Sequence, residues 1–109
     1  GKPVTYVIRT YVDGTVQSVT DAGATAPEAE HLGKEVRFIP KMKQKRGNGG
    51  GWIAEWAIPF SAIGLKPMPK LKVAFNMCAY INEYGKWHCW EGTQVESWQV
   101  DQAGMLLLK

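Results

Sequence analysis

The sequence predicts a small all-β domain whose antiparallel strands pack as a β-sandwich or a barrel-like pair of sheets. Runs of β-branched and aromatic residues alternate with polar residues. Turn residues separate about six or seven such runs, and no amphipathic pattern as long as about ten residues indicates a helix. A chain of 109 residues can bury one hydrophobic core. We therefore expect a single domain over residues 1–109.

A β-hairpin is the first expected element. Residues 4–12 and 15–20 are rich in β-branched and aromatic side chains. Asp13 and Gly14 lie between them, and this pair supplies the positive φ values of a tight turn. The hairpin is thus predicted from turn chemistry as well as from strand composition.

The next segment changes from loop to strand. Residues 21–33 lack a β pattern and are expected to form a loop, with or without one helical turn after Pro27. Residues 34–44 alternate in a β pattern, and Pro40 within them favours an edge strand or a bulge, because proline donates no ladder hydrogen bond. One side of this strand is expected to carry Val36, Phe38, Pro40 and Met42, and the other Arg37, Ile39, Lys41 and Lys43.

A glycine-rich stretch then connects two strands. GNGGG at residues 47–51 is expected to be a hairpin connection, and residues 52–58 the following strand. Trp52 and Trp56 are in phase with Ala54 and Ile58, so both indoles are predicted to lie in the core. Pro59 ends this strand, and residues 61–65 are expected to form a short turn or 3₁₀ segment closed by Gly64.

The longest predicted strand covers residues 71–82. A turn at Tyr84-Gly85 leads to a strand at residues 86–91, and residues 105–108 are a last, apolar strand. The inward side chains expected on the longest strand are Val73, Phe75, Met77, Ala79 and Ile81. The outward ones are Lys72, Asn76, Cys78, Tyr80 and Asn82.

Charge and composition disfavour several classes of partner. The net charge of +3 comes mostly from KMKQKR at residues 41–46, which is too local for a typical nucleic-acid footprint. A solvated edge that resists strand-to-strand aggregation explains this run most simply, and an anionic ligand is the alternative. No stretch is long and apolar enough for a bilayer, so no membrane partner is expected. The chain opens Gly1-Lys2-Pro3 without Met, which favours a processed or excised piece.

No set of residues typical of catalysis is visible. The acidic residues are scattered, His31 and His88 are the only histidines, and no nucleophile-elbow or phosphate-loop sequence occurs. We therefore expect no enzyme activity and no cofactor. Cys78 and Cys89 flank the predicted turn, and their spacing is compatible with a disulfide or with two buried thiols. Without a CxxC motif or a His/Cys cluster, no metal site is expected.

Aromatic and amide side chains gather in the C-terminal third. Trp87, Trp90 and Trp98 occur there with Asn76, Asn82, Gln94, Glu96 and Gln99. A sugar ring stacks its apolar face on aromatic rings while amides and carboxylates bond its hydroxyl groups, so this composition predicts a carbohydrate site. The alternative for each Trp is a place in the core, and for Trp98 both remain open. Arg9, flanked by Tyr6 and Tyr11, is either a ligand donor or a paired structural residue.

The sequence GGGWIAEWAIPFSAIGLKP, followed by KLKVAFNM and a terminal AGMLLLK, resembles the family 9 carbohydrate-binding modules and their wider relatives. Members carry an aromatic-x-x-Glu-x-x-Ile-Pro-Phe/Leu-Ser-x-Ile/Leu-Gly signature, a strand with Phe-Asn, and a terminal Gly-x-Leu-x-Leu strand. The opening strand with its following glycine is also similar. The matching residues are Trp52, Glu55, Ile58, Pro59, Phe60, Ser61, Ile63, Gly64, Phe75, Asn76, Gly104, Leu106 and Leu108.

This resemblance implies an antiparallel β-sandwich of immunoglobulin-like or jelly-roll type, attached to a secreted enzyme that degrades polysaccharide. It also implies a sugar end clamped between two Trp rings, with Arg9, Asn76 and Trp98 at positions of the family's binding residues. Family 9 modules are longer, and their N-terminal half, with further strands, calcium ligands and the first Trp, has no counterpart here. Either the chain is a shortened relative in which Trp87 or Trp90 replaces the lost ring, or it is a fragment of a longer module whose edges a partner completes.

The leading hypothesis is an extracellular, non-catalytic carbohydrate-binding module, accessory to a glycoside hydrolase. Its expected partner is a polysaccharide or oligosaccharide such as cellulose, xylan or β-glucan, and the resemblance leaves calcium open. The predicted ligand-binding residues are Trp98, Trp90, Trp87, Arg9, Asn76, Tyr80, Asn82 and Gln99. The alternative is a structural or assembly β-sandwich module that mediates protein–protein association, for example as a homodimer.

Overall fold

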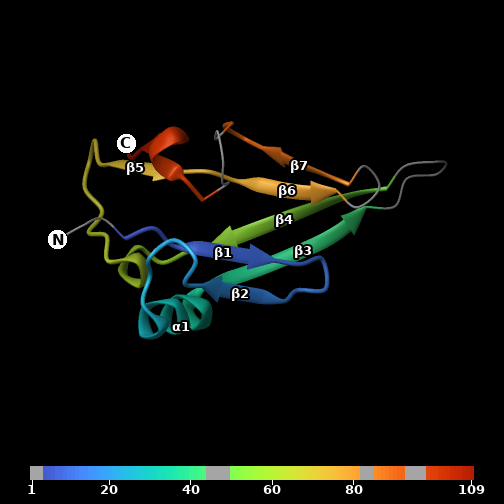
Figure 1. The fold of residues 1–109 in the computed structure, drawn as a ribbon, viewed down its shortest axis with the longest axis horizontal. Coiled ribbons are helices and arrows are strands. Elements are labelled where there is room, and N and C mark those ends of the chain that lie inside the picture. Colours follow the sequence, from blue (N-terminus) through green and yellow to red (C-terminus); the bar gives the residue numbers. More distant parts are fainter. Residues whose placement is uncertain (1–3, 44–49, 82–84, 93–97) are drawn as a thin grey trace. The chain divides into compact units, whose positions relative to one another are not determined.

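Two units make up the chain in its computed structural model, one covering Gly1–Lys66 and the other Pro67–Lys109. The structure describes residues 4–43, 50–81, 85–92 and 98–109. Strands are the commonest regular elements among these residues, all pairs of named strands are antiparallel, and one short α-helix is present among them. No helix in the described ranges has the length and apolar character needed to cross a membrane. Figure 1 shows the elements in chain order.

The first unit opens with the predicted hairpin. Strand β1 (Val7–Thr10) pairs with β2 (Val16–Val19), and Thr10 faces Val16 at the turn end. Three residues of each strand are half-buried, and the exposed residues, Arg9 and Gln17, are cross-strand partners. The hairpin prediction is therefore confirmed, although the ladder is shorter than the two predicted runs.

The turn of this hairpin differs from the predicted one. The Gly14 N–H donates to the Tyr11 carbonyl (2.9 Å), and the Tyr11 N–H donates to the Thr15 carbonyl (3.0 Å). Among residues 12–14 only Gly14 has a positive φ (93°), so the loop has three residues rather than two. The Thr15 N–H donates to the Asp13 carboxylate (2.9 Å), and this hydrogen bond lowers the pKa of Asp13.

Helix α1 (Ala26–Glu35) corrects the expected loop at residues 21–33. Thr25 and Glu28 form a capping box, in which the Glu28 carboxylate accepts from the Thr25 N–H (2.7 Å) and the Glu28 N–H donates to Thr25 Oγ1 (3.4 Å). Pro27 lies in the first turn, where its missing N–H costs nothing. The capping-box pattern Thr-x-x-Glu was thus the sequence signal for a helix that extends well beyond one turn.

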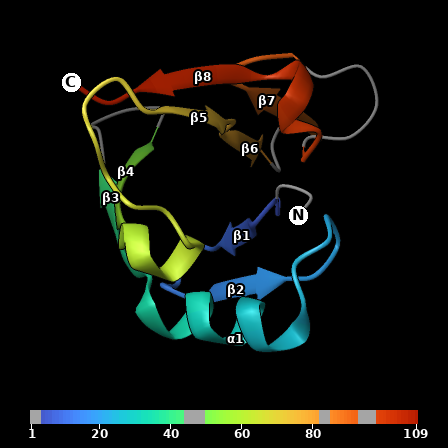
Figure 2. The same cartoon turned by 90° about the vertical axis from the view of Figure 1, so that its left-hand side faces the viewer.

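The core of the first unit lies where α1 packs against the hairpin. Leu32 is fully buried, and Val36 and Ala62 join it. Figure 2 shows α1 running alongside β2, and Gly33 lies next to Ser18, where an added Cβ would be at ordinary contact distance (3.6 Å) from Ser18 Cβ. Partly buried side chains around the cluster are Tyr6, Ile8, Val16, Ile58 and Ile63. This packing stabilises a helix whose own sequence is only weakly amphipathic.

A second hairpin joins β3 (Arg37–Lys43) to β4 (Gly51–Ala57). The pairing runs without interruption to Lys43 and Gly51, so the predicted hairpin is confirmed, while residues 47–49 of its connection lie outside the described residues. Residues 34 and 35 end α1, which corrects the expected start of this strand. Within the described residues this sheet has two strands only, so Pro40 lies on an edge strand as predicted.

The two tryptophans of β4 differ in their surroundings. Trp56 is half-buried, and its ring centroid lies 5.2 Å from that of Phe38, its cross-strand partner. Trp52 is 44% exposed and pairs with the exposed Met42. The core prediction is therefore wrong for Trp52, because the hydrophobic cluster covers only the end of the hairpin that leads to Ile58. The following 3₁₀ turn η1 (Phe60–Ile63) ends at Gly64 (φ 67°), as predicted.

In the second unit the longest predicted strand is divided. Residues 71–82 supply β5 (Lys72–Phe75), which pairs with β8 (Gly104–Leu107), and β6 (Cys78–Ile81), which pairs with β7 (Lys86–Cys89). The predicted return strand and the last apolar strand are thus confirmed with shifted ends. Met77 lies in the break and is exposed, which corrects its expected inward place.

The break has a clear physical cause at Asn76. Its Oδ1 accepts hydrogen bonds from the N–H groups of Met77 (2.9 Å) and Glu91 (3.1 Å), and its Nδ2 donates to the Glu91 carbonyl (3.1 Å). The Asn76 side chain therefore forms hydrogen bonds with backbone N–H and carbonyl groups that would otherwise bond to the neighbouring strand in a continuous ladder. A short 3₁₀ turn, η2 (Val100–Gln102), precedes β8.

Candidate functional site

The β6–β7 hairpin carries the largest exposed aromatic pair in the described part of the second unit. Its turn end is held by the Gly85 N–H, which donates to the Ile81 carbonyl (2.9 Å), and Gly85 has a φ of 60°. The register pairs Tyr80 with Trp87 and Cys78 with Cys89. Because side chains two positions apart share a face, all four side chains lie on one side of the hairpin.

The hydrogen-bond pattern of the hairpin brings the two side chains of each pair close together. The Trp90 N–H donates to the Met77 carbonyl (2.7 Å), which makes residues 77 and 90 a hydrogen-bonded pair. Since hydrogen-bonded and non-hydrogen-bonded pairs alternate along an antiparallel ladder, Cys78–Cys89 and Tyr80–Trp87 are both non-hydrogen-bonded pairs. Side chains approach more closely at such pairs, so this face favours both cross-links and ring contacts.

The two rings of the pair touch each other and remain open to solvent. The ring centroids of Tyr80 and Trp87 are 5.3 Å apart with an interplanar angle of 56°. Tyr80 is 49% exposed and Trp87 is 63% exposed. Exposed aromatic groups of this size need a reason in a folded protein, and a stacking surface for a ligand is one. We refer to Tyr80 and Trp87 as the aromatic pair.

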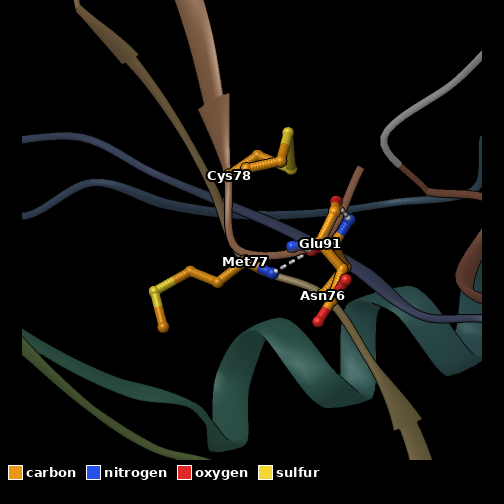
Figure 3. The surroundings of a disulfide bond; sticks show 5 residues. Asn76, Met77, Cys78 and Glu91 are labelled. Atoms are coloured by element: carbon orange, nitrogen blue, oxygen red, sulfur yellow. Dashed lines mark hydrogen bonds between the residues drawn. A yellow bond between two sulfur atoms is a disulfide. The ribbon is translucent and has the colours of Figure 1, made fainter. Parts of the chain in front are cut away.

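A disulfide between Cys78 and Cys89 lies next to the aromatic pair on the same face. The Cα atoms are 4.0 Å apart, and this pairing decides between the two states that the sequence left open. Figure 3 shows the disulfide beside the hydrogen bonds that the Asn76 side chain accepts from the N–H groups of Met77 and Glu91. Asn76, predicted as a ligand residue, thus makes its described hydrogen bonds to backbone groups and fixes the base of the hairpin.

Trp90 occupies a different place from the aromatic pair. Its ring centroid lies 5.8 Å from that of Phe75, and a Cβ on Gly104 would lie 2.5 Å from the indole Cζ3. The indole therefore lies against the backbone of β8, in the space that the missing Gly104 side chain leaves. Trp90 is still 52% exposed, so one side of the ring packs on protein and the rest contacts solvent.

The remaining polar and aromatic residues predicted from the C-terminal third are Trp98, Gln99, Asn82, Gln94 and Glu96. Trp98 and Gln99 lie immediately before η2, and both are half-buried. The Trp98 carbonyl accepts a hydrogen bond from the Val100 N–H (2.8 Å). Asn82, Gln94 and Glu96 lie outside the described residues.

Arg9 belongs to the first unit and has a protein partner. Its Nη2 lies 2.6 Å from Asp21 Oδ2 in an ion pair whose side chains are about half exposed. Close by on the same hairpin, the Tyr11 hydroxyl donates to Gln17 Oε1 (3.3 Å), and Gln17 is the cross-strand partner of Arg9. Of the two interpretations left open for Arg9, the structure supplies the paired one. Trp87, Trp90 and Trp98 belong to the second unit.

The described residues offer apolar and hydrogen-bonding chemistry rather than a metal centre. Within the described ranges, no three His, Cys, Asp or Glu side chains lie close enough to hold a metal ion. Sequence reasoning named Tyr80 and Trp87 separately but missed that they are cross-strand partners. Had the Cys78–Cys89 disulfide been assumed, it would have fixed the register and with it this pairing.

The aromatic pair on its cross-linked hairpin is thus defined by geometry alone, since comparisons with protein-family models, with curated proteins and with solved structures found no match to this chain.

Proposed function

We propose that this chain is a non-catalytic carbohydrate-binding module that stacks a sugar ring on the aromatic pair. The observation that carries the proposal is the exposure of Tyr80 and Trp87, 49% and 63%, on a hairpin cross-linked next to them. Sugar rings present an apolar C–H face that packs on such rings, and a preorganised surface loses little entropy on binding. The expected ligands are plant-type polysaccharides such as cellulose, xylan and β-glucan.

The wider setting belongs to the same proposal. A disulfide is typical of oxidising compartments, which supports an extracellular module attached to an enzyme that degrades polysaccharide. The resemblance to family 9 modules at residues 49–67 supports a sandwich arrangement of the antiparallel sheets, of immunoglobulin-like or jelly-roll type. In that arrangement the domain would present the aromatic pair as its ligand surface.

Affinity electrophoresis across cellulose, xylan, β-glucan and mannan derivatives tests the proposal, with Trp87→Ala beside the natural chain. We expect retardation in at least one polysaccharide and at least about tenfold weaker binding by the variant, as for a central aromatic contact. The matched control is Trp52→Ala, which removes an exposed tryptophan from the first unit and should leave binding unchanged. Equal binding by Trp87→Ala and the natural chain would exclude the aromatic pair.

A second candidate function is protein–protein association, and the β5–β8 sheet favours it. On one face of this sheet Met105 and Leu107 are 55% and 59% exposed, opposite Ala74 and Lys72. Within the described residues the sheet has two strands only, so each strand also has an edge without a described partner. Sedimentation at several protein concentrations discriminates the two functions. A concentration-dependent oligomer that ignores every glycan would favour association.

A further inference from the structure

The geometry of the rings also bears on which part of a polysaccharide is bound. A clamp for a chain end needs two ring faces that are nearly parallel and far enough apart to hold a sugar between them. With contacts of about 3.5–4.0 Å on each side, the two ring planes must be separated by about 7–8 Å. An open surface has no such requirement, because the sugar contacts rings on one side only.

The aromatic pair cannot act as a clamp. Its ring centroids are 5.3 Å apart and the planes are inclined by 56°, so no sugar ring fits between Tyr80 and Trp87. The short distance follows from their place at a non-hydrogen-bonded position of the ladder, beside the cross-link of Cys78 to Cys89. A ligand can therefore contact this pair only from the solvent side of the hairpin.

Trp87 and Trp90 do not form a clamp with each other either. Trp90 pairs with Met77 and is three positions from Trp87, so strand alternation places the two indoles on opposite faces of the hairpin. One side of the Trp90 indole is also covered by Gly104 and Phe75. The chain-end clamp implied by the family resemblance therefore lacks two facing rings among Tyr80, Trp87 and Trp90.

We infer that the aromatic pair binds an internal segment of an extended polysaccharide chain, which lies across the hairpin and continues past it at both ends. Binding from one side leaves the bound sugars without a facing ring among Tyr80, Trp87 and Trp90. Long chains then offer many overlapping sites, whereas a clamp for a chain end would offer one per chain. This inference rests on the proposed carbohydrate binding and specifies the ligand of the same surface.

Titration calorimetry with the full chain tests the inference through stoichiometry. The probes are two size fractions of soluble β-glucan and two of soluble xylan, differing by about tenfold in length, each with its molar chain concentration known. For a ligand bound along its length, we expect the number of protein molecules per polysaccharide chain to rise roughly in proportion to length. One protein molecule per chain in both fractions would overturn the inference while leaving carbohydrate binding established.

Trp98→Ala provides a second measurement, because a clamp completed by Trp98 would need its indole. We expect this variant to keep the rise in the number of bound protein molecules with chain length. One protein per chain in the natural protein, together with loss of binding in Trp98→Ala, would show a chain-end clamp and exclude the open surface. No binding of the natural chain to any glycan would exclude the proposed function itself.

Discussion

Gly104 shows how the absence of one side chain shapes an aromatic surface. It pairs with Phe75 across the β5–β8 ladder, and the Trp90 indole fills the space above it. An aromatic ring that covers a glycine in a neighbouring strand restores contacts that glycine cannot make itself. Its φ is not positive, so the requirement for glycine here is steric and concerns the indole rather than the backbone.

Substituting Gly104→Ala should displace the Trp90 indole, because the new Cβ would lie 2.5 Å and 2.6 Å from two of its ring atoms. We expect a loss of stability of about 1–3 kcal/mol, as for other overpacked sites, and a changed near-ultraviolet circular dichroism signal. Gly92→Ala is the matched control, since a Cβ at Gly92 meets nothing within 4 Å. Identical unfolding midpoints for the two variants would contradict this account of Trp90.

Residue types in the candidate site were predictable, but their partners were not. The sequence indicated Tyr80, Trp87 and Trp90 as site residues. It could not show that Tyr80 contacts Trp87 or that Arg9 pairs with Asp21, since both contacts depend on register and loop course. Asn76 was expected to bind ligand, and its amide instead bonds the backbone of Met77 and Glu91.

Among the elements, α1 shows how tertiary packing and capping outweigh a weak periodic pattern. Gly33 supplies no side chain to its apolar face, and the buried residues of this segment are Ala29, Leu32 and the following Val36. The strands were predictable because alternation and turn glycines agree locally. Their bounds were not, since Asn76 ends β5 through side-chain hydrogen bonds that the pattern does not reveal.

The capping box makes the stability of α1 dependent on pH. Hydrogen bonds from Thr25 lower the pKa of Glu28 below its usual 4.5, so the unfolded state binds this proton more readily than the folded state. The stabilisation is therefore present above pH 4.5 and is lost as the pH falls through the lowered folded pKa. Glu28→Gln keeps an acceptor for the Thr25 N–H but does not titrate.

Thermal unfolding followed by circular dichroism from about pH 7 to about pH 3 compares the natural chain with Glu28→Gln. We expect the natural chain to lose its advantage in unfolding midpoint as the pH falls, so that the two curves converge at low pH. Parallel curves over the whole range would show that the Glu28 charge does not stabilise the cap.

For the whole molecule, the sequence predicted one all-β domain, and the described residues form four two-stranded antiparallel sheets and one helix in two units. The β class can be predicted from local sequence patterns, because the strands of a hairpin pair with residues that are close in the sequence. How sheets stack depends on contacts between distant parts of the chain, which alternation within a strand does not encode. The sandwich thus remains part of the proposal.

The overall charge gives a prediction about the ligand. A net charge of +3, with Lys41 and Lys43 exposed on β3, would favour an anionic ligand through interactions that salt screens. The affinity for a neutral glycan bound through the aromatic pair should instead change by less than about twofold between about 50 mM and about 500 mM NaCl. Calorimetric titration at the two salt concentrations measures this difference. A steep loss of affinity in high salt would favour the basic run as the binding surface.

The amide of Asn76 has a consequence for how the second unit opens. One stretch of chain serves two separate ladders, β5 with β8 and β6 with β7, and the β6–β7 pairing extends toward β5 only as far as the hydrogen bond from the Trp90 N–H to the Met77 carbonyl. Fraying of one ladder therefore need not propagate into the other. In native-state hydrogen exchange the amide protons of the two ladders should fall into separate protection groups, with the cross-linked one retaining its protons independently of its neighbour.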